Sequence, residues 1–360
     1  MREIDYRLAK FVERLYDVRC IGINSIANEL NMSYTAIMSK LMQLYSQGFS
    51  FRGFIDIRKL KLREVAVISK YDVAISTEVP FLRSYVNLIP QGSYLTFYVP
   101  DLGDEENSRK FLSKILTKLG ITQQEVDFIV TRELKRVSLI RYRWPLDSVA
   151  RANDPSEWLK IIDDYEEAFK KYETVVSIPH VRAIRVRKSS SERLRLDSQC
   201  LRVLKEVERG PLRRLKDISC SAKVNFRKVM KCVKTFIDRG IFCGLRIAKT
   251  PWGKLTDLYA VALIKTSHIS EALALMESSV RFPLSAGSMV GEKGRIYIAF
   301  RIKSSNLAAF KRFLQRIEQM LGFDVVWMGI GPIHMSGAFT VPYKQGFEYS
   351  KYKKGWLTDI

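Results

Sequence analysis

The chain has 360 residues, of which 60 are Lys or Arg and 38 are Asp or Glu, and its formal net charge at pH 7 is +22. Hydrophobic residues make up 47% of the sequence, enough for buried cores, so the composition excludes a disordered basic tail. No apolar run approaches the roughly 18–20 residues of a membrane-spanning helix, the N-terminus lacks the apolar region of a secretory signal, and the charge favours a polyanionic partner.

The sequence contains an internal repeat, because residues 5–48 align without a gap onto 197–240 at a constant offset of 192. Matched positions include Leu15 with Val207, and Gly48 with Gly240. Later segments follow in the same order: VAVISK (65–70) with VALIKT (261–266), YLTFYV (94–99) with RIYIAF (295–300), and FLSKILTKLG (111–120) with FLQRIEQMLG (313–322). The ordered series predicts a tandem duplication.

Each copy is predicted to begin with three helices. In the first copy they cover residues 5–17, 25–31 and 34–47, with Ser33 as N-cap of the third and Gly48 just beyond its end. Two short helices joined by a tight turn are typical of a helix-turn-helix. The alternating run over 49–62 predicts a two-stranded wing after it.

The remainder of each copy has the order β, α, β, β, α, β, with a short first helix, which favours a ferredoxin-like domain. The predicted fold class is therefore α+β, with two tandem units that each join a winged helix-turn-helix to a ferredoxin-like βαββαβ domain. The expected boundaries are 1–62 and 63–145 for the first unit, 146–196 for a helical brace and basic linker, 197–254 and 255–342 for the second unit, and 343–360 for a C-terminal extension.

The segment between the copies is predicted to contain a helix that starts at Asp154-Pro155 and carries Trp158, Ile161 and Tyr165 on one face. We expect this helix to brace the two halves. The basic residues that follow it, from Arg185 to Arg195, lie either against a phosphate backbone or in a solvated linker. The Gly-rich GIGPIH (329–334) is predicted to be a turn.

The segment SIANELNMSYTAIMSKLMQLYSQGFS resembles the winged helix-turn-helix of feast/famine (Lrp/AsnC-type) transcriptional regulators, and the ferredoxin-like segment resembles their regulatory domain. The resemblance implies dimerisation through the sheets of that domain, so a tandem copy would be a dimer folded into one chain, with self-association through the sheets as a further expectation. QGSYL and GEKGRIY stand where the family has a Gly-x-Tyr/Asp turn near its ligand site, so no small-molecule effector is assigned.

The positive charge is concentrated in the second copy. Residues 182–254 hold 21 Lys and Arg against 6 Asp and Glu, a net charge of +15, whereas residues 1–61 hold 10 against 6. Such focusing favours a nucleic-acid interface. In the second copy the predicted DNA-contacting residues are Asn225, Arg227, Lys228, Lys231 and Lys234 on the third helix, Arg213 and Arg214 on the second helix, and Arg246, Lys249 and Lys254 in the wing.

The matching face of the first copy is neutral. Its predicted DNA-contacting residues are Ser33, Tyr34, Thr35, Ser39 and Gln43 on the third helix, with Arg52, Arg58 and Lys59 in the wing. This face either reads bases through neutral hydrogen bonds or has become a protein-contact or dimerisation surface. For any single lysine, a solvated surface position is an equally good interpretation.

Residues that would indicate an enzyme are sparse. The three histidines, His180, His268 and His334, are far apart, and no phosphate-binding loop or nucleophile elbow is present, so neither a metal nor a cofactor is expected. The five cysteines form no Cys-x-x-Cys pair and are predicted to be reduced, buried thiols.

The interpretation is a cytoplasmic, archaeal-type transcriptional regulator, not an enzyme, that binds an asymmetric site on double-stranded DNA mainly through its second winged helix. One alternative is an architectural or replication-initiation DNA-binding protein. The other alternative follows from the same resemblance, because some Lrp-like proteins are siroheme decarboxylases. In that case cationic groups would bind the substrate carboxylates and His180 or His334 would donate protons.

Overall fold

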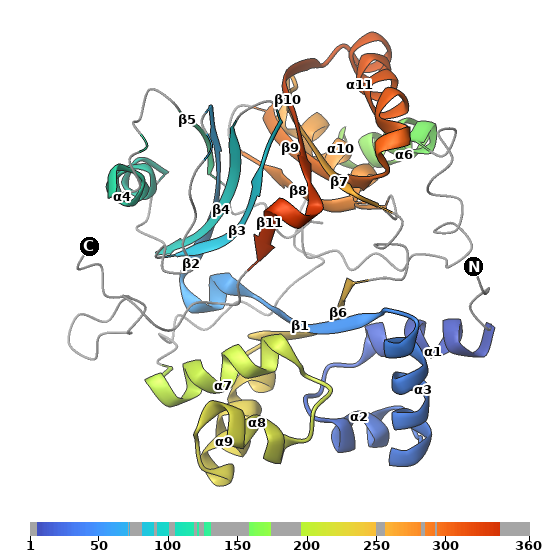
Figure 1. Ribbon diagram of the computed structural model, residues 1–360, viewed down its shortest axis with the longest axis vertical. Helices are drawn as coiled ribbons and strands as arrows, with labels where there is room; N and C mark the ends of the chain where they lie inside the picture. The colour runs from blue at the N-terminus through green and yellow to red at the C-terminus, as the bar shows by residue number, and fades with distance from the viewer. Residues whose placement is uncertain are drawn as a thin grey trace.

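The computed structural model describes residues 6–70, 72, 81–89, 92–100, 105–118, 121, 126–130, 158–173, 196–249, 256–281, 285–291 and 294–338. These residues form an α+β structure with three antiparallel sheets. Two larger sheets occupy the upper part of Figure 1 and face each other. Two groups of helices lie below them, and a two-stranded ribbon lies between the helices and the sheets.

Two three-helix units occupy the lower part of the molecule. The first helical unit comprises α1 (Tyr6–Asp17), α2 (Ile23–Glu29) and α3 (Tyr34–Ser46), and the second comprises α7 (Ser198–Arg209), α8 (Leu215–Ala222) and α9 (Phe226–Asp238). The bounds of α1 and α7, and those of α3 and α9, differ by the predicted offset of 192. The three helices of each copy are confirmed, although α2 begins two residues earlier than expected.

The predicted wings are wrong, because the two copies share one ribbon. Strand β1 (Ser50–Ile55) pairs with β6 (Phe242–Lys249) of the other copy, and β1 is followed by the short 3-10 helix η1 (Ile57–Leu60) instead of a second wing strand. The close approach of β1 to α7 requires Gly53, where a Cβ would lie 2.8 Å from the Val207 carbonyl oxygen. Among the described residues, neither copy supplies a second wing strand of its own, and each ribbon strand pairs with the other copy.

The first sheet has the strand order β11-β3-β4-β2-β5, in which β11 is Ser336–Ala338, and the second has β10-β7-β9-β8. The first contains β2 (Leu62–Ser69), β3 (Leu82–Asn87), β4 (Ser93–Pro100) and β5 (Val126–Val130), with α4 (Glu105–Lys118) before β5. The second contains β7 (Leu258–Lys265), β8 (Ser285–Val290), β9 (Arg295–Ile302) and β10 (Asp324–Pro332), with α10 (Ile269–Arg281) after β7, and with η8 (Ser304–Asn306) and α11 (Leu307–Leu321) before β10.

The second half thus has the βαββαβ order that the sequence predicts. Its first helix, α10, is not short, since it has 13 residues. In the first half, the corresponding helix would fall between β2 and β3, mostly outside the described residues.

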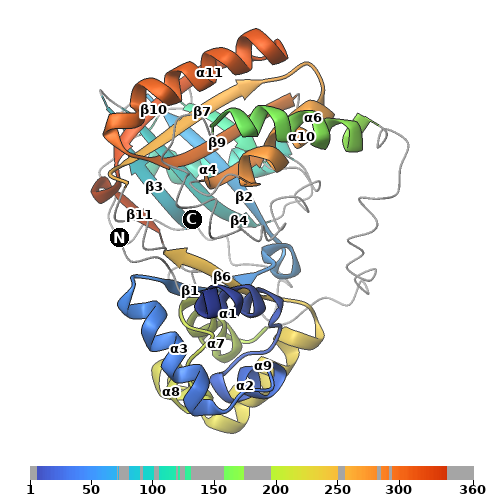
Figure 2. The ribbon, with the colours of Figure 1, turned by 90° about the vertical axis from the view of Figure 1, so that its right-hand side faces the viewer.

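The two sheets pack face to face, and their helices cover the outer faces, with α4 outside the first sheet and α6, α10 and α11 outside the second (Figures 1 and 2). Tyr94 of β4 and Tyr297 of β9 stack between the sheets with ring centroids 4.2 Å apart. The strand β11 (Ser336–Ala338), which follows η9 (Ile333–Met335), adds to the edge of the first sheet beside β3. One half therefore completes the sheet of the other.

The GIGPIH segment is not a turn, because residues 329–332 belong to β10. A Cβ on Gly331 would overlap the Asn87 carbonyl oxygen, and one on Gly329 would meet the side chains of Trp327 and Leu88. The glycines therefore allow close approach of the second sheet to the end of β3.

The connecting helix α6 (Lys160–Glu173) packs against the second sheet, and its role as a brace between the halves stays a prediction. Ile161 and Tyr165 of α6, with Trp158 just before the helix, are buried in the core of the second sheet, and α10 lies alongside (Figure 2). Its predicted start at Asp154-Pro155, the basic linker after it and the C-terminal extension 343–360 lie outside the described residues. Within the described part of the chain, no helix is long and apolar enough to cross a membrane.

The prediction of reduced, buried cysteines holds only in part: Cys20, Cys220 and Cys243 are free thiols, whereas the other two are oxidised. Cys200 of α7 and Cys232 of α9 form a disulfide, because the packing of the two helices brings their Cα atoms within 5.4 Å. Cys220 is exposed, and Cys20 and Cys243 are partly exposed.

Candidate nucleic-acid interface

The outward face of α9 carries the cations predicted from the sequence. Val229, Cys232, Val233 and Phe236 are buried, which leaves Arg227, Lys231 and Lys234 exposed on the opposite face. None of these three side chains has a hydrogen-bond or ion-pair partner among the residues that the structure describes. Their charge is therefore available to a ligand.

Two predicted contact residues of α9 have internal partners. The Asn225 side chain caps the helix by accepting a hydrogen bond from the backbone N–H of Lys228 at 2.8 Å. The ammonium of Lys228 forms an ion pair with Asp197, the N-cap residue of α7. Burial raises the pKa of Asp197, but hydrogen bonds from Lys228 and from backbone N–H groups outweigh it and leave the pKa below its ordinary value.

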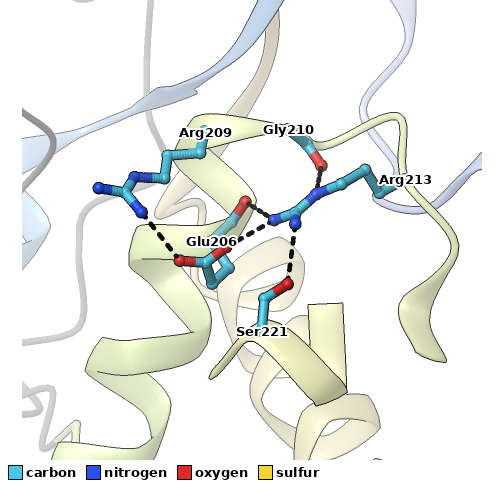
Figure 3. A network of polar contacts seen from close by, with 5 residues as sticks. All are labelled: Glu206, Arg209, Gly210, Arg213 and Ser221. Carbon is cyan, nitrogen blue, oxygen red and sulfur yellow. Dashed lines mark hydrogen bonds and ion pairs between the residues drawn. The ribbon is translucent and has the colours of Figure 1, made fainter. Parts of the chain in front are cut away.

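Arg213 and Arg214 precede α8 and do not lie on it, since the helix begins at Leu215. Figure 3 shows the Arg213 side chain hydrogen-bonded within its own unit: it donates to the Glu206 carboxylate at 2.9 Å, to the Glu206 and Gly210 carbonyls at 2.8 and 3.3 Å, and to Ser221 Oγ at 3.2 Å. Arg214 forms an exposed ion pair with Asp217. Arg213 therefore holds the turn between α7 and α8.

The equivalent face in the first unit is uncharged. Ser33 caps α3 by accepting a hydrogen bond from the Ala36 N–H, as predicted. Tyr34, Thr35, Ser39 and Gln43 are all exposed. The two units meet where α2 begins, through hydrogen bonds from Gly22 N–H to the Pro211 carbonyl and from Ile23 N–H to the Arg213 carbonyl.

The residues expected in two wings instead lie on the shared ribbon or next to it. Arg52 of β1 is directly opposite Arg246 of β6, and Lys249 is opposite Ser50. Arg58 and Lys59 lie in η1, while Lys254 lies outside the described residues. The ribbon thus places cations from both copies on one element, which the repeat alone did not indicate.

Sequence reasoning missed a polar cluster at the sheets. The guanidinium of Arg83 (β3) is buried, donates from Nε to the Tyr98 hydroxyl at 3.1 Å and pairs with the Glu208 carboxylate of α7 at 3.1 Å. Burial lowers the pKa of Arg83, but Tyr98 and Glu208 outweigh it and raise the pKa above its ordinary value. Arg301 of β9 similarly donates to the Tyr259 hydroxyl at 3.0 Å and lies over the Tyr259 ring.

Burial is also the main cause of the raised pKa values of the stacked pair Tyr94 and Tyr297, and the nearby charge of Glu64 raises both further. His268 and His334 are exposed, and His180 lies outside the described residues. Among the described side chains, no group of three His, Cys, Asp or Glu residues is placed to hold a metal ion.

No protein-family model and no curated protein sequence matches the chain. Among solved structures, siroheme decarboxylase NirDL in complex with an iron-uroporphyrin III analogue matches with a TM-score of 0.51 at 10% identity, over 89% of this chain and 90% of that chain. A second NirDL structure matches with a TM-score of 0.50 at 9% identity, over the same shares.

The chain shares its fold with siroheme decarboxylase NirDL. An AsnC family transcriptional regulator from Agrobacterium tumefaciens is also similar, at 15% identity and a TM-score of 0.24, over 37% of this chain and 91% of that chain. The likeness to NirDL covers both halves, which agrees with the repeat in the sequence.

Proposed function

We propose that this protein binds double-stranded DNA as a transcriptional regulator, with α9 as the recognition helix of a helix-turn-helix formed by α8 and α9. The observation that carries the proposal is the set of exposed, unpaired cations on α9, at Arg227, Lys231 and Lys234. A recognition helix enters the major groove, where arginine and lysine contact guanine edges and phosphates.

The difference between the two units supports an asymmetric site. The units have matching helices, yet α3 offers Thr35 and Ser39 where α9 offers Arg227 and Lys231. A symmetric dimer imposes a palindromic site because its two readers are identical. Two non-identical readers in one chain should select a non-palindromic site, with most of the affinity from the second unit.

The test is selection of bound duplexes from a random DNA pool at near-physiological salt, followed by binding titrations with variants. We expect an enriched, non-palindromic motif. The double variant R227A/K231A should lose specific binding, whereas the matched variant T35A/S39A should retain most of it. Equal losses would contradict the asymmetry, and retention of duplexes without enrichment would favour an architectural or replication role.

A siroheme decarboxylase-like enzyme is the second candidate, and the full-length comparisons favour it over the first. NirDL is the protein whose fold matches over both halves. Decarboxylation replaces a carboxylate by a proton and releases CO₂, so such an enzyme needs cations for the substrate carboxylates and a proton donor. Arg301 beside Tyr259, at the sheets, is the candidate carboxylate ligand, and the exposed His334 the candidate donor.

Absorption titration of the purified chain with an iron-uroporphyrin tests this candidate. Binding that shifts the tetrapyrrole spectrum and is weakened at least tenfold by R301A, together with CO₂ release that H334A abolishes, would support it. An unchanged spectrum would exclude it, and the DNA selection would be unaffected by that result.

A further inference from the structure

The α9 helix exposes large apolar side chains beside its cations. Phe226 is 44% exposed and Met230 is 46% exposed, one helical turn apart. Each is followed directly in sequence by a cation, Arg227 or Lys231, so the apolar pair and the cations form adjacent stripes along one helix. A position on a helix surface can hold a polar residue, so folding alone does not explain an aromatic ring and a thioether at these two exposed positions.

The first unit has related residues at these two positions, without the cations. At the repeat offset of 192, Tyr34 corresponds to Phe226 and Met38 corresponds to Met230. Tyr34 is 42% exposed, and Met38 is partly buried against the helical core. Only Tyr34 of the first unit is therefore exposed like its counterpart, so the exposed apolar pair, like the charge, belongs to α9.

We propose that Phe226 and Met230 contact thymine methyl groups in the major groove and so make the protein prefer thymine where they face the bases. This inference rests on the proposed DNA-binding function. The thymine methyl is the distinct apolar group that the major groove presents, and apolar side chains recognise it by contact. The adjacent Arg227 and Lys231 supply the electrostatic attraction that brings the apolar pair to the groove.

The positive charge of α9 also argues against a second copy of the chain as the partner that contacts Phe226 and Met230. Two α9 helices packed through Phe226 and Met230 would bring Arg227, Lys231 and Lys234 of each copy together. Like charges at close range oppose such a contact, whereas a polyanion neutralises them.

Replacement of thymine by deoxyuridine in the selected duplex tests the inference, because it removes only the methyl group. We expect the dissociation constant of the full chain to rise roughly fourfold for each contacted methyl, the fold-change that corresponds to ~0.8 kcal/mol per buried carbon group. F226A should bind the thymine duplex more weakly and lose the discrimination against uridine, with an unchanged salt dependence. The matched variant R227A should retain the discrimination and reduce the salt slope by about one.

Three outcomes would overturn the inference. Equal affinity of the wild-type chain for the thymine and uridine duplexes would refute it and leave the DNA-binding function standing. Loss of self-association in sedimentation of F226A, without any change in base discrimination, would make the stripe an interface between copies. Absence of binding to every duplex would refute both the inference and the proposed function.

Discussion

Arg213 and Arg214 are adjacent in sequence but have different environments. The Arg213 guanidinium donates to three oxygens of Glu206 and Ser221, whereas Arg214 pairs with Asp217 in water. Because the partly buried Arg213 guanidinium already donates hydrogen bonds within the protein, few of its N–H groups remain to donate to a DNA phosphate. Local sequence cannot distinguish the two, since the partners of Arg213 come from α7 and from the end of α8.

Replacement of Arg213 by alanine should lower the free energy of unfolding by about 1.5–3 kcal/mol, the usual value for hydrogen bonds to charged groups. The measurement is a urea unfolding midpoint. The salt slope of DNA binding should be unchanged, while K231A should reduce it by about one. R214A is the matched control and should leave the unfolding midpoint unchanged. A reduced salt slope for R213A would show that this guanidinium reaches phosphate.

The carboxylate of Asp197 should make stability depend on pH. Its pKa is below the ordinary value in the folded protein, so its contribution is complete above the unfolded-state pKa and is lost as the pH falls through the folded-state pKa. D197N retains an N-cap side chain but loses the ion pair with Lys228, which at this partly exposed position is worth less than about 1 kcal/mol. The difference between wild type and D197N in urea unfolding should therefore begin to shrink as the pH falls below about 4 and disappear once the pH is below the folded-state pKa. A difference that persists at pH 2 would indicate loss of the cap instead.

At the scale of elements, the strands depart from expectation more than the helices do. Helix α3 begins where the sequence indicates and α9 begins at the matching position of the repeat, because their hydrogen bonds and caps are local, as at Ser33 and Asn225. Strand β1 looks like one half of a wing, but its partner is β6, almost 200 residues away in the chain. Strand pairing depends on a partner that the local pattern does not specify.

Gly331 of strand β10 provides a test of how closely β10 packs against the end of β3. G331A should destabilise the protein by roughly 1–3 kcal/mol, because the added methyl would overlap the backbone carbonyl of Asn87 and separate the sheets. G322A is the control: its Cβ has no neighbour within 4 Å, and only the left-handed backbone, with φ of 66°, opposes it. The expected cost there is ~1–2 kcal/mol. Thermal unfolding of both variants gives the comparison, and weaker packing between Tyr94 and Tyr297 should accompany G331A alone.

At the scale of the whole molecule, the layers are joined by a buried ion pair. Arg83 of the first sheet and Glu208 of the second helical unit are 8% and 4% exposed at their side chains. The pair therefore links the sheet of one copy to the helices of the other. A mutation at either residue would remove one member of a buried ion pair.

E208A should lower the free energy of unfolding by about 3–5 kcal/mol, the usual cost of an uncompensated buried charge. The double variant R83M/E208L, which replaces both charges by apolar groups, should lose less than E208A alone. Denaturant unfolding of the single and double variants completes the cycle. Additive losses would show that the two residues act independently.

The register of the two sheets also became clear only at this scale. The sequence alignment matches Val65 with Val261, yet Val65 faces the helix-covered side of its sheet and Val261 faces the other sheet. A shift of one residue reverses the faces of a strand, so the true equivalence differs from the alignment by an odd number of residues. Tyr94 lies opposite Ile68 and Tyr297 lies opposite Leu263, so in each sheet the stacked tyrosine pairs with an aliphatic residue in the core between the sheets.

The sequence by itself determined the internal repeat, the three helices of each unit, the Ser33 cap and the concentration of charge on the second unit. These features depend on residues close in the chain, on a periodicity of 3.6 and on composition. Only the tertiary structure decided that β1 pairs with β6, that α6 covers the second sheet, that Cys200 bonds to Cys232 and that Arg213 donates hydrogen bonds to Glu206. Each of those depends on contacts between segments far apart in sequence, where the free energy of packing and pairing, rather than local preference, selects the partner.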